Sequence, residues 1–440
     1  VSSTWCYGVG VFGSDTAETA VIKGKIIVTG VNPALSGNGR DRYTATTIEL
    51  APGSVVSAAN SVAIYHPQAG TLTVNGGEIK GTGGIECKGG DTTLTFQGNP
   101  TVTATAPSIE HTGNNNGAST DGYAISIAEN KNYVAGATVT IASGTYTGPI
   151  GIVTDNDVTP EQKGSIVITG GTFNSDPTVY CAPGYGATDN GNGTYTVSCI
   201  FAGGTGTEND PFLVATAEQF AAISSLFTKT STPYYFRQTA DLVVSATDVT
   251  FAGVYDGGGF KLESGRSSSA YVYLFKQPAG HVTVKNLTVN MTDTGTALFW
   301  LLDWGTGYGA DFENITFTSE HELTLDNVNN FGFVTVNSPY TAGSGRVVYN
   351  FINITNNVNL QNTGTCTGVI TGACPYSSVT TELNFVNCVN NGNITGTYQV
   401  GFLYGNGTYI NVNYGKGEGA ALKANTLIYV TGCQNNGTLA

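Results

Sequence analysis

Three eight-residue stretches in the C-terminal half share one pattern, an Asn-Asn pair inside an alternating segment. They are residues 353–360 (NITNNVNL), 387–394 (NCVNNGNI) and 432–439 (GCQNNGTL). This pattern predicts a stacked repeat whose coils turn at the asparagines and then re-enter a sheet. Asn tolerates the left-handed conformation of a corner, and we expect its side chains to form ladders between successive coils. A solenoid of this kind carries its functional groups on an outer surface.

The composition favours strands and an array of repeats. The chain has 440 residues, of which 60 are Gly and only 11% are charged. This length predicts two modules or one long array. The net charge of −14 argues against a nucleic-acid surface, which needs clustered Lys and Arg. No run of 18 apolar residues occurs and the first residue is Val, which is typical of a processed or trimmed extracellular segment without membrane insertion.

Short β-rich runs separated by Gly, Asn or Pro corners fill residues 20–179. Gly pairs such as Gly76-Gly77 fall between them, where a tight corner needs a positive φ. This spacing predicts a three-sided coil of about 20 to 25 residues. An antiparallel β-sandwich is the alternative, but two-residue hairpin signals are few. The runs are Ile26–Thr29, Thr46–Leu50, Ser61–Tyr65, Thr71–Val74, Thr93–Phe96, Thr138–Ile141 and Ser165–Thr169.

The pattern changes near residue 200. A turn cluster at 189–193 followed by a strand at 194–197 predicts a closing edge, and 203–211 is typical of a linker. Thr216 and Gln219 then form a capping box ahead of one apolar stripe, made of Phe220, Ile223, Leu226 and Phe227. We therefore expect a capping α-helix near 216–228, laid across the open end of a second solenoid.

The fold class that follows is all-β. We predict two consecutive right-handed parallel β-helix (β-solenoid) modules. The first spans residues 1–199, and the second, helix-capped and Asn-rich, spans 200–440.

Residues 200–440 resemble the repeat modules of bacterial adhesin-like surface proteins, including the GLUG-motif group. The matching segments are GTENDPFL at 206–213, AEQFAAIS at 217–224 and FAGVYDGGGFKL at 251–262. The Gly-Leu-Phe-Gly core of that group is replaced here by Tyr273-Leu-Phe-Lys276 and Ala297-Leu-Phe-Trp300. Residues 60–199 look like a companion module of similar secreted proteins. The resemblance implies β-helices displayed outside the cell, mostly without an established activity or ligand.

The cysteines and histidines do not predict a metal site. Eight Cys lie far apart without a CxxC pair, and four His, His66, His111, His281 and His321, show no i, i+4 spacing. We therefore expect no metal and no cofactor. The sequence is compatible with two disulfides, Cys366–Cys374 and Cys181–Cys199, and equally with free cysteines that fill the core as small apolar side chains.

Three pairs of Asp residues are the candidates for the active site of a polysaccharide lyase or hydrolase. Such enzymes need several carboxylates converging from neighbouring coils. None of the pairs forms a catalytic signature, because these Asp residues are typical of turns or of strand ends that point outward. We therefore predict no catalytic residue. The pairs are Asp155 with Asp157, Asp241 with Asp256, and Asp303 with Asp311.

The aromatic segment 299–308 (FWLLDWGTGY) is the most distinctive local composition. Aromatic faces stack on sugar rings and a nearby Asp accepts hydroxyl hydrogen bonds, so an exposed segment forms a carbohydrate platform. The candidate ligand-binding residues are Trp300, Asp303, Trp304 and Tyr308. In the alternative, Phe299, Leu301 and Trp300 lie in the coil core and Trp304 covers a corner.

The function that we predict is a secreted or cell-surface, non-catalytic, adhesin-like display protein that binds host or microbial surface glycans or proteins. Nucleic acid is not an expected partner. The alternatives are a polysaccharide-degrading β-helix enzyme, similar to a phage tailspike, and a structural spacer without a ligand. Eight N-x-S/T sequons occur, about as many as chance gives, and so are no evidence for glycosylation: Asn192, Asn286, Asn290, Asn314, Asn353, Asn393, Asn406 and Asn436.

Overall fold

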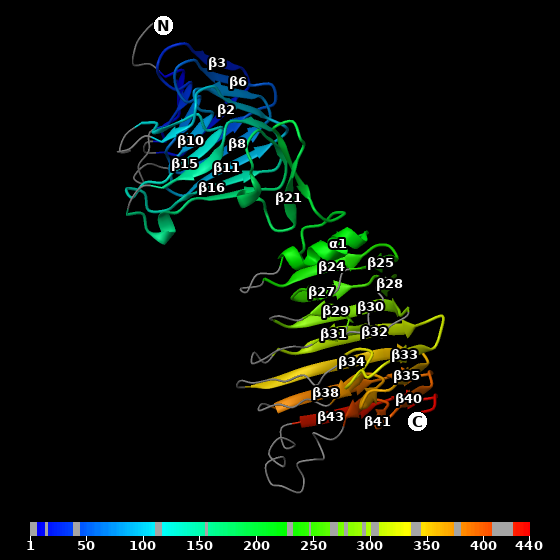
Figure 1. Cartoon of the computed structure of the whole chain (residues 1–440). Coiled ribbons are helices and arrows are strands. Elements are labelled where there is room, and N and C mark those ends of the chain that lie inside the picture. Colours follow the sequence, from blue (N-terminus) through cyan, green and yellow to red (C-terminus); the bar gives the residue numbers. More distant parts are fainter. Residues whose placement is uncertain are drawn as a thin grey trace. The chain divides into compact units, whose positions relative to one another are not determined.

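The computed structural model divides the chain into two compact units, Val1–Cys199 and Ile200–Ala440. We call them unit 1 and unit 2 and describe each by itself; Figure 1 shows the coils of each stacked on one another. The structure describes residues 7–13, 16–37, 45–110, 117–154, 157–226, 232–245, 248–264, 272–276, 280–292, 296–300, 308–335, 345–373, 380–406 and 426–440.

Unit 1 is a parallel β-helix with three sheets, and each coil gives one strand to each sheet. The first sheet contains β2 (Glu18–Ile22), β5 (Thr46–Leu50), β8 (Gly70–Asn75), β11 (Thr92–Gln97), β16 (Ala137–Ile141) and β19 (Ser165–Ile168). The second contains β3 (Lys25–Val28), β6 (Val55–Ala58), β9 (Glu78–Gly81), β12 (Thr101–Ala104), β17 (Thr145–Thr147) and β20 (Gly171–Phe173). The third contains β1 (Val9–Gly10), β4 (Leu35–Ser36), β7 (Ile64–His66), β10 (Ile85–Cys87), β15 (Ile125–Ala128) and β18 (Ile150–Val153).

The core of unit 1 consists of apolar rows that run from coil to coil. In the first sheet, Leu72, Leu94 and Val139 are register partners and are fully buried. Burial of each such side chain contributes about 1.5–3 kcal/mol, which no single coil can gain alone. The predicted runs are strands or overlap strands, and the parallel pairing shows that the β-sandwich alternative is wrong.

Unit 1 departs from a regular winding at two places. The coil that begins at β11 carries an excursion with an antiparallel pair, β13 (Ile109–Glu110) and β14 (Thr120–Asp121), so it is longer than predicted. The last coil ends in an antiparallel hairpin of β21 (Tyr185–Asp189) and β22 (Tyr195–Cys199), and β22 also pairs with β20. Two 3₁₀ turns lie nearby, η1 (Pro160–Gln162) and η2 (Thr178–Tyr180).

Unit 2 is also a parallel β-helix, built on one large sheet that we call the main sheet. Its parallel strands are β23 (Phe212–Val214), β24 (Tyr234–Gln238), β27 (Gly253–Asp256), β30 (Val282–Asn290), β32 (Ala310–Thr318), β34 (Arg346–Asn356), β38 (Thr380–Val386) and β43 (Thr426–Thr431). Four short strands join its side: β25 (Leu242–Val244), β28 (Lys261–Ser264), β39 (Val389–Asn390) and β44 (Gln434–Asn435).

The remaining strands of unit 2 form small parallel sheets on the other sides of the coils. One contains β26 (Val249–Thr250), β29 (Val272–Lys276) and β31 (Thr296–Trp300), and another β33 (Leu323–Leu325), β35 (Leu360–Asn362) and β40 (Ile394–Gly396). Two pairs complete the coils: β36 (Cys366–Gly368) with β41 (Gln399–Gly401), and β37 (Thr371–Ala373) with β42 (Tyr404–Asn406).

An asparagine ladder runs along one corner of unit 2. Asn353 donates from Nδ2 to Asn314 Oδ1 at 2.7 Å, and Asn314 donates to Asn286 Oδ1 at 2.9 Å. Asn387 continues the ladder by donating to Asn353 Oδ1 at 3.3 Å. All four residues have φ between 53° and 55°, the left-handed region in which Asn is favoured over other side chains. Gly432, with φ 66°, occupies the same position in the last coil.

The Asn-Asn pairs of the three repeats form two further ladders, as predicted. Asn356 and Asn390 are fully buried; Asn356 donates to Asn390 Oδ1 at 2.8 Å and Asn390 to Asn435 Oδ1 at 2.7 Å. The second residues of the pairs form an exposed ladder of the same kind, Asn436 to Asn391 to Asn357, with both bonds at 2.8 Å. Buried amides that pair only when the coils are in register also specify that register.

The capping helix of unit 2 is present but shorter than predicted. It comprises α1 (Ala217–Ala222) and the 3₁₀ turn η3 (Ile223–Leu226), and Thr216 Oγ1 accepts a hydrogen bond from Gln219 N at 3.3 Å. Phe220 is fully buried and lies 5.4 Å from Phe275, measured between ring centroids. After Ala222 the chain continues as the 3₁₀ turn, in which Ser225 Oγ donates to Ala222 O at 2.6 Å and so competes with the backbone bonds of a longer α-helix. Phe227 lies outside the described residues.

The cysteines that the structure describes are free. Cys181 and Cys199 are both unbridged, and Cys199 faces Tyr185 in the hairpin register, so of the two alternatives that the sequence left open, free cysteine holds here. Cys366 is also a free, buried thiol, and its proposed partner Cys374 lies outside the described residues.

The corner ladder predicts an unusual order of stabilities at position 353. Asn353→Ala loses both ladder bonds and also the polar side chain whose local hydrogen bonds let Asn tolerate φ 55°, so we expect the free energy of unfolding of unit 2 to fall by about 2–3 kcal/mol. Asn353→Gly loses only the bonds, and should be about 1 kcal/mol more stable than Asn353→Ala. Urea denaturation of the full chain, followed by circular dichroism, measures both. An alanine variant at least as stable as the glycine variant would contradict a stabilising left-handed corner.

Candidate functional site

Of the four predicted ligand-binding residues, the structure describes the surroundings of Tyr308 alone. Trp300 is the last residue of β31, but its side chain, like Asp303 and Trp304, lies outside the description. Tyr308 is half-buried, and its carbonyl oxygen accepts a hydrogen bond from the Tyr349 hydroxyl at 2.9 Å. The four-residue platform stays a prediction. Tyr308 lies just before β32, which carries the polar side chains described next.

A polar row follows the outer face of the main sheet from this point. It consists of Thr283, Asp311, Asn350, Asn384 and Tyr429, which are register partners on β30, β32, β34, β38 and β43. We call it the Asp311 row; Figure 1 shows the five strands lying in this order. Adjacent strands are spaced by about 4.8 Å, so the row is about 19 Å long.

The amides of the Asp311 row point their donors toward the carboxylate. Asn384 Nδ2 donates to Asn350 Oδ1 at 2.8 Å, and Asn350 Nδ2 donates to Asp311 Oδ1 at 2.6 Å. Each amide therefore orients the next one, and the chain of bonds ends on a charged acceptor. Hydrogen bonds to an ionised group are about twice as strong as neutral ones, so this end of the row is the most rigidly held.

His281 completes the environment of Asp311. Its Nε2 lies 2.8 Å from Asp311 Oδ2, and the two side chains are 52% and 24% exposed. Partial burial acts to raise the pKa of Asp311, but the hydrogen bonds from His281 and Asn350 outweigh it and hold that pKa below its ordinary value of 3.8. Asp311 is therefore ionised at neutral pH.

A second carboxylate, that of Glu382, lies beside the Asp311 row and bonds to Asn384. Glu382, which is 8% exposed, contacts the Arg346 guanidinium through Oε2 and accepts from Asn384 Nδ2 through Oε1 at 2.9 Å. Asn384 therefore links Glu382 to the row. The sequence analysis did not predict the Arg346–Glu382 and His281–Asp311 pairs, because the two members of each pair are 30 to 40 residues apart in the chain. The signal that could have found them is that the residues lie at outward positions on strands one coil apart.

This arrangement suits binding better than hydrolysis. Asp311 and Glu382 stand two coils apart, about 10 Å along the solenoid axis. This separation is too long for the nucleophile and acid of a retaining glycosidase, about 5–5.5 Å, and lies just beyond the roughly 6.5–9.5 Å of an inverting one. Both oxygens of each carboxylate are already engaged by neighbouring side chains. Within the described residues, no group of three His, Cys, Asp or Glu side chains is placed to hold a metal ion.

The other carboxylate pairs serve the backbone where they are described. Asp256 Oδ1 accepts from Gly258 N at 2.9 Å and from Asn286 Nδ2 at 3.0 Å, and Asp241 Oδ1 accepts from Lys261 N at 2.7 Å. Asp157 has φ 72°, as a turn residue does, and Asp155 lies outside the described residues. The expectation that these residues shape turns and edges is confirmed for the three described here.

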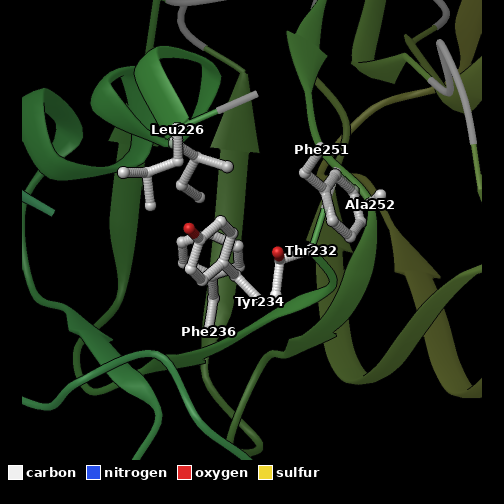
Figure 2. Close-up of a pocket in the computed structure, with 7 residues that line it drawn as sticks. Leu226, Thr232, Tyr234, Phe236, Phe251 and Ala252 are labelled. Carbon is white, nitrogen blue, oxygen red and sulfur yellow. The ribbon is translucent and has the colours of Figure 1, made fainter. Parts of the chain in front are cut away.

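A hollow beneath the cap of unit 2 is too small for a ligand site. Figure 2 shows Leu226 on one side and Phe251 and Ala252 on the other, with Tyr234 and Phe236 between them. Its volume is about 200 Å³, part of it open to solvent, against about 300–1,000 Å³ for ordinary ligand pockets. The lining is mainly apolar, and we assign it to imperfect packing under the short helix.

Unit 1 contains a buried charged cluster that holds its excursion in place. Glu86 is fully buried, and its carboxylate accepts five hydrogen bonds of 3.0 Å or less from four donors, the backbone and hydroxyl groups of Ser119 and Thr120. Lys88, 2% exposed, lies 3.6 Å from Glu86 Oε1. These contacts tie residues 119–120 to the outer face of the third sheet and leave no room for a ligand at Glu86.

Comparisons with known proteins add little about function. No family model matches the sequence, and no curated protein matches it. A solved structure described as a "putative immunoglobulin A1 protease" from Bacteroides ovatus is similar over 55% of this chain and 82% of that chain, with 13% identity and a TM-score of 0.33. A likeness of this extent carries no argument about activity. Among the described residues, no helix has the length and apolar character that crossing a membrane needs.

The lowered pKa of Asp311 predicts a loss of stability in acid. A carboxylate with a depressed pKa in the folded state stabilises the fold above its ordinary pKa of 3.8, and loses that contribution as the pH falls through the lower folded value. We expect Asp311→Asn to be less stable than the parent protein at pH 6, with the difference shrinking below pH 4. Chemical denaturation at a series of pH values measures it. A difference that does not change with pH would show that Asp311 is not ionised in this network.

Proposed function

We propose that this chain is an extracellular, adhesin-like display segment that binds glycans on the outer face of unit 2 and catalyses no reaction. The observation that supports it best is the Asp311 row, in which five successive coils present a hydroxyl, a carboxylate, two amides and a phenol. The likeness to adhesin-like, GLUG-type modules supports the same function and the extracellular location.

The chemistry of the row fits a hydroxyl-rich ligand. Amide and carboxylate side chains hold donors and acceptors in one plane, and rigid strands position them before the ligand arrives, which lowers the entropy lost on binding. Tyr429, 52% exposed, lies in register with Asn384 at the far end of the row. Its ring can stack on a sugar face beside the polar groups. Tyr308, the described member of the predicted platform, lies just before β32, which carries Asp311.

Charge narrows the ligand class. The chain carries a net charge of −14, and the site has carboxylates at Asp311 and Glu382 with one arginine beside them. Polyanionic glycans are repelled by such a surface. We therefore expect neutral or amine-bearing oligosaccharides to bind, in an extended conformation along the axis of the coils.

A glycan array, followed by affinity measurements on the best ligand, tests the proposal. Asp311→Asn keeps the shape of the side chain but removes a charged acceptor, so we expect about a tenfold or greater loss of affinity. Asn384→Ala, which removes the link to Glu382, should act in the same direction. Thr71→Ala is the matched control, because Thr71 is exposed on β8 of unit 1, and binding should not change.

Trp304→Ala reports separately on the aromatic platform, and circular dichroism verifies that each variant is folded. Binding that Asp311→Asn leaves intact would exclude the Asp311 row, and an absence of binding to every glycan would favour a spacer. Release of shorter sugars from a bound glycan would favour the polysaccharide-degrading alternative.

A further inference from the structure

Two cysteines occupy equivalent positions in the last two described coils of unit 2. Cys388 follows the ladder residue Asn387, and Cys433 follows Gly432. The residues just after them are register partners, Val389 with Gln434 and Asn390 with Asn435, and Gln434 N donates to Cys388 O at 2.9 Å. The two cysteines are therefore stacked one coil apart, about 4.8 Å between Cα atoms, which lies inside the 4.4–6.8 Å range of disulfides.

The two thiols also point the same way. Cys388 Sγ donates to Phe351 O at 3.3 Å, and Cys433 Sγ donates to Phe385 O at 3.5 Å. Phe351 and Phe385 are themselves register partners, so the second thiol repeats the geometry of the first one coil further on. Both belong to an inward row that begins with Leu287, Ile315 and Ile354, all buried.

The electrostatics agree with a short separation of the sulfurs. Burial, together with a smaller effect of the neighbouring Cys433 thiol, raises the pKa of Cys388 to about 12. No other described cysteine is stacked in this way. The register partners of Cys87 are His66 and Ile127, and the partner of Cys366 is Gln399.

We propose that Cys388 and Cys433 form a reversible disulfide that fastens the last coil of unit 2 to the one before it. With a small-molecule disulfide as oxidant, the thiolate of Cys433, the more exposed of the two, attacks one sulfur and releases the first small thiol. The thiolate of Cys388 then attacks Cys433 Sγ, forms the intramolecular S–S bond and releases the second small thiol. Two protein thiols are oxidised, and one small disulfide is reduced to two thiols.

The cross-link would close a covalent loop of the chain from residue 388 to residue 433. It would also hold β43, which carries Tyr429, against β38. Because the pair is one coil apart and the reduced thiols fit the fold, both the open and the closed states are compatible with the stacked coils.

Peptide mapping of the full chain tests the proposal. The reduced protein is incubated with oxidised glutathione at pH 8, alkylated, and digested with a protease that cleaves after Glu. Cleavage after Glu382 and Glu418 places Cys388 alone in peptide 383–418 and Cys433 alone in peptide 419–440. We expect the two peptides joined, with the loss of two hydrogens, and separated again by a reductant.

Variants and pH distinguish this bond from other thiol chemistry. Cys388→Ser and Cys433→Ser should each abolish the joined peptide, whereas Cys366→Ser should leave it unchanged. Closure should speed up about tenfold per pH unit between pH 7 and 9, because the thiolate of Cys388 is scarce below its raised pKa. A peptide joining Cys374 to either residue, or glutathione retained on Cys433 without closure, would overturn the proposal.

Discussion

Stacking of the coils in register is the constraint on which both units depend. A single coil of unit 1 presents only a few apolar side chains to its interior, and rows such as Leu72, Leu94 and Val139 become a core only when coils lie directly on one another. Parallel pairing of the strands also supplies hydrogen-bond partners for the backbone N–H and C=O groups. A shift of one residue would turn every buried side chain outward, so register and burial are one requirement.

Asparagine enforces that requirement in unit 2. At the corner, Asn286, Asn314 and Asn353 adopt a left-handed conformation and bond to one another. This corner explains the repeated Asn-x-Thr triplets. After each Asn the strand continues, with the middle residue pointing inward and Thr pointing outward. Inside the coils, Asn356 and Asn390 place amides where an unpaired group would be costly. The same residue type thus satisfies corners and specifies register, and its abundance is no signal for glycosylation or catalysis.

This geometry leaves the outward positions of the strands available for the proposed binding surface. The Asp311 row exists because strands of adjacent coils hold residues 28 to 45 positions apart at about 4.8 Å, with side chains that alternate between core and surface. The buried Glu86 cluster of unit 1 follows the same rule with the opposite result, since an excursion covers it and its hydrogen bonds are used within the protein. Exposure therefore separates the candidate binding surface from a structural cluster of similar chemistry.

Local patterns in the sequence were sufficient to predict the short strands, the Gly and Asn corners, the capping helix with Phe220 and Ile223 buried, and the Asn ladders. These features depend on neighbouring residues or on one repeated motif. The extent of α1, the free state of Cys181 and Cys199, and the pairing of His281 with Asp311 were decided by tertiary structure. The physical reason is coil length: excursions of different size separate stacked residues by irregular intervals, so no fixed spacing in the chain reveals which side chains meet.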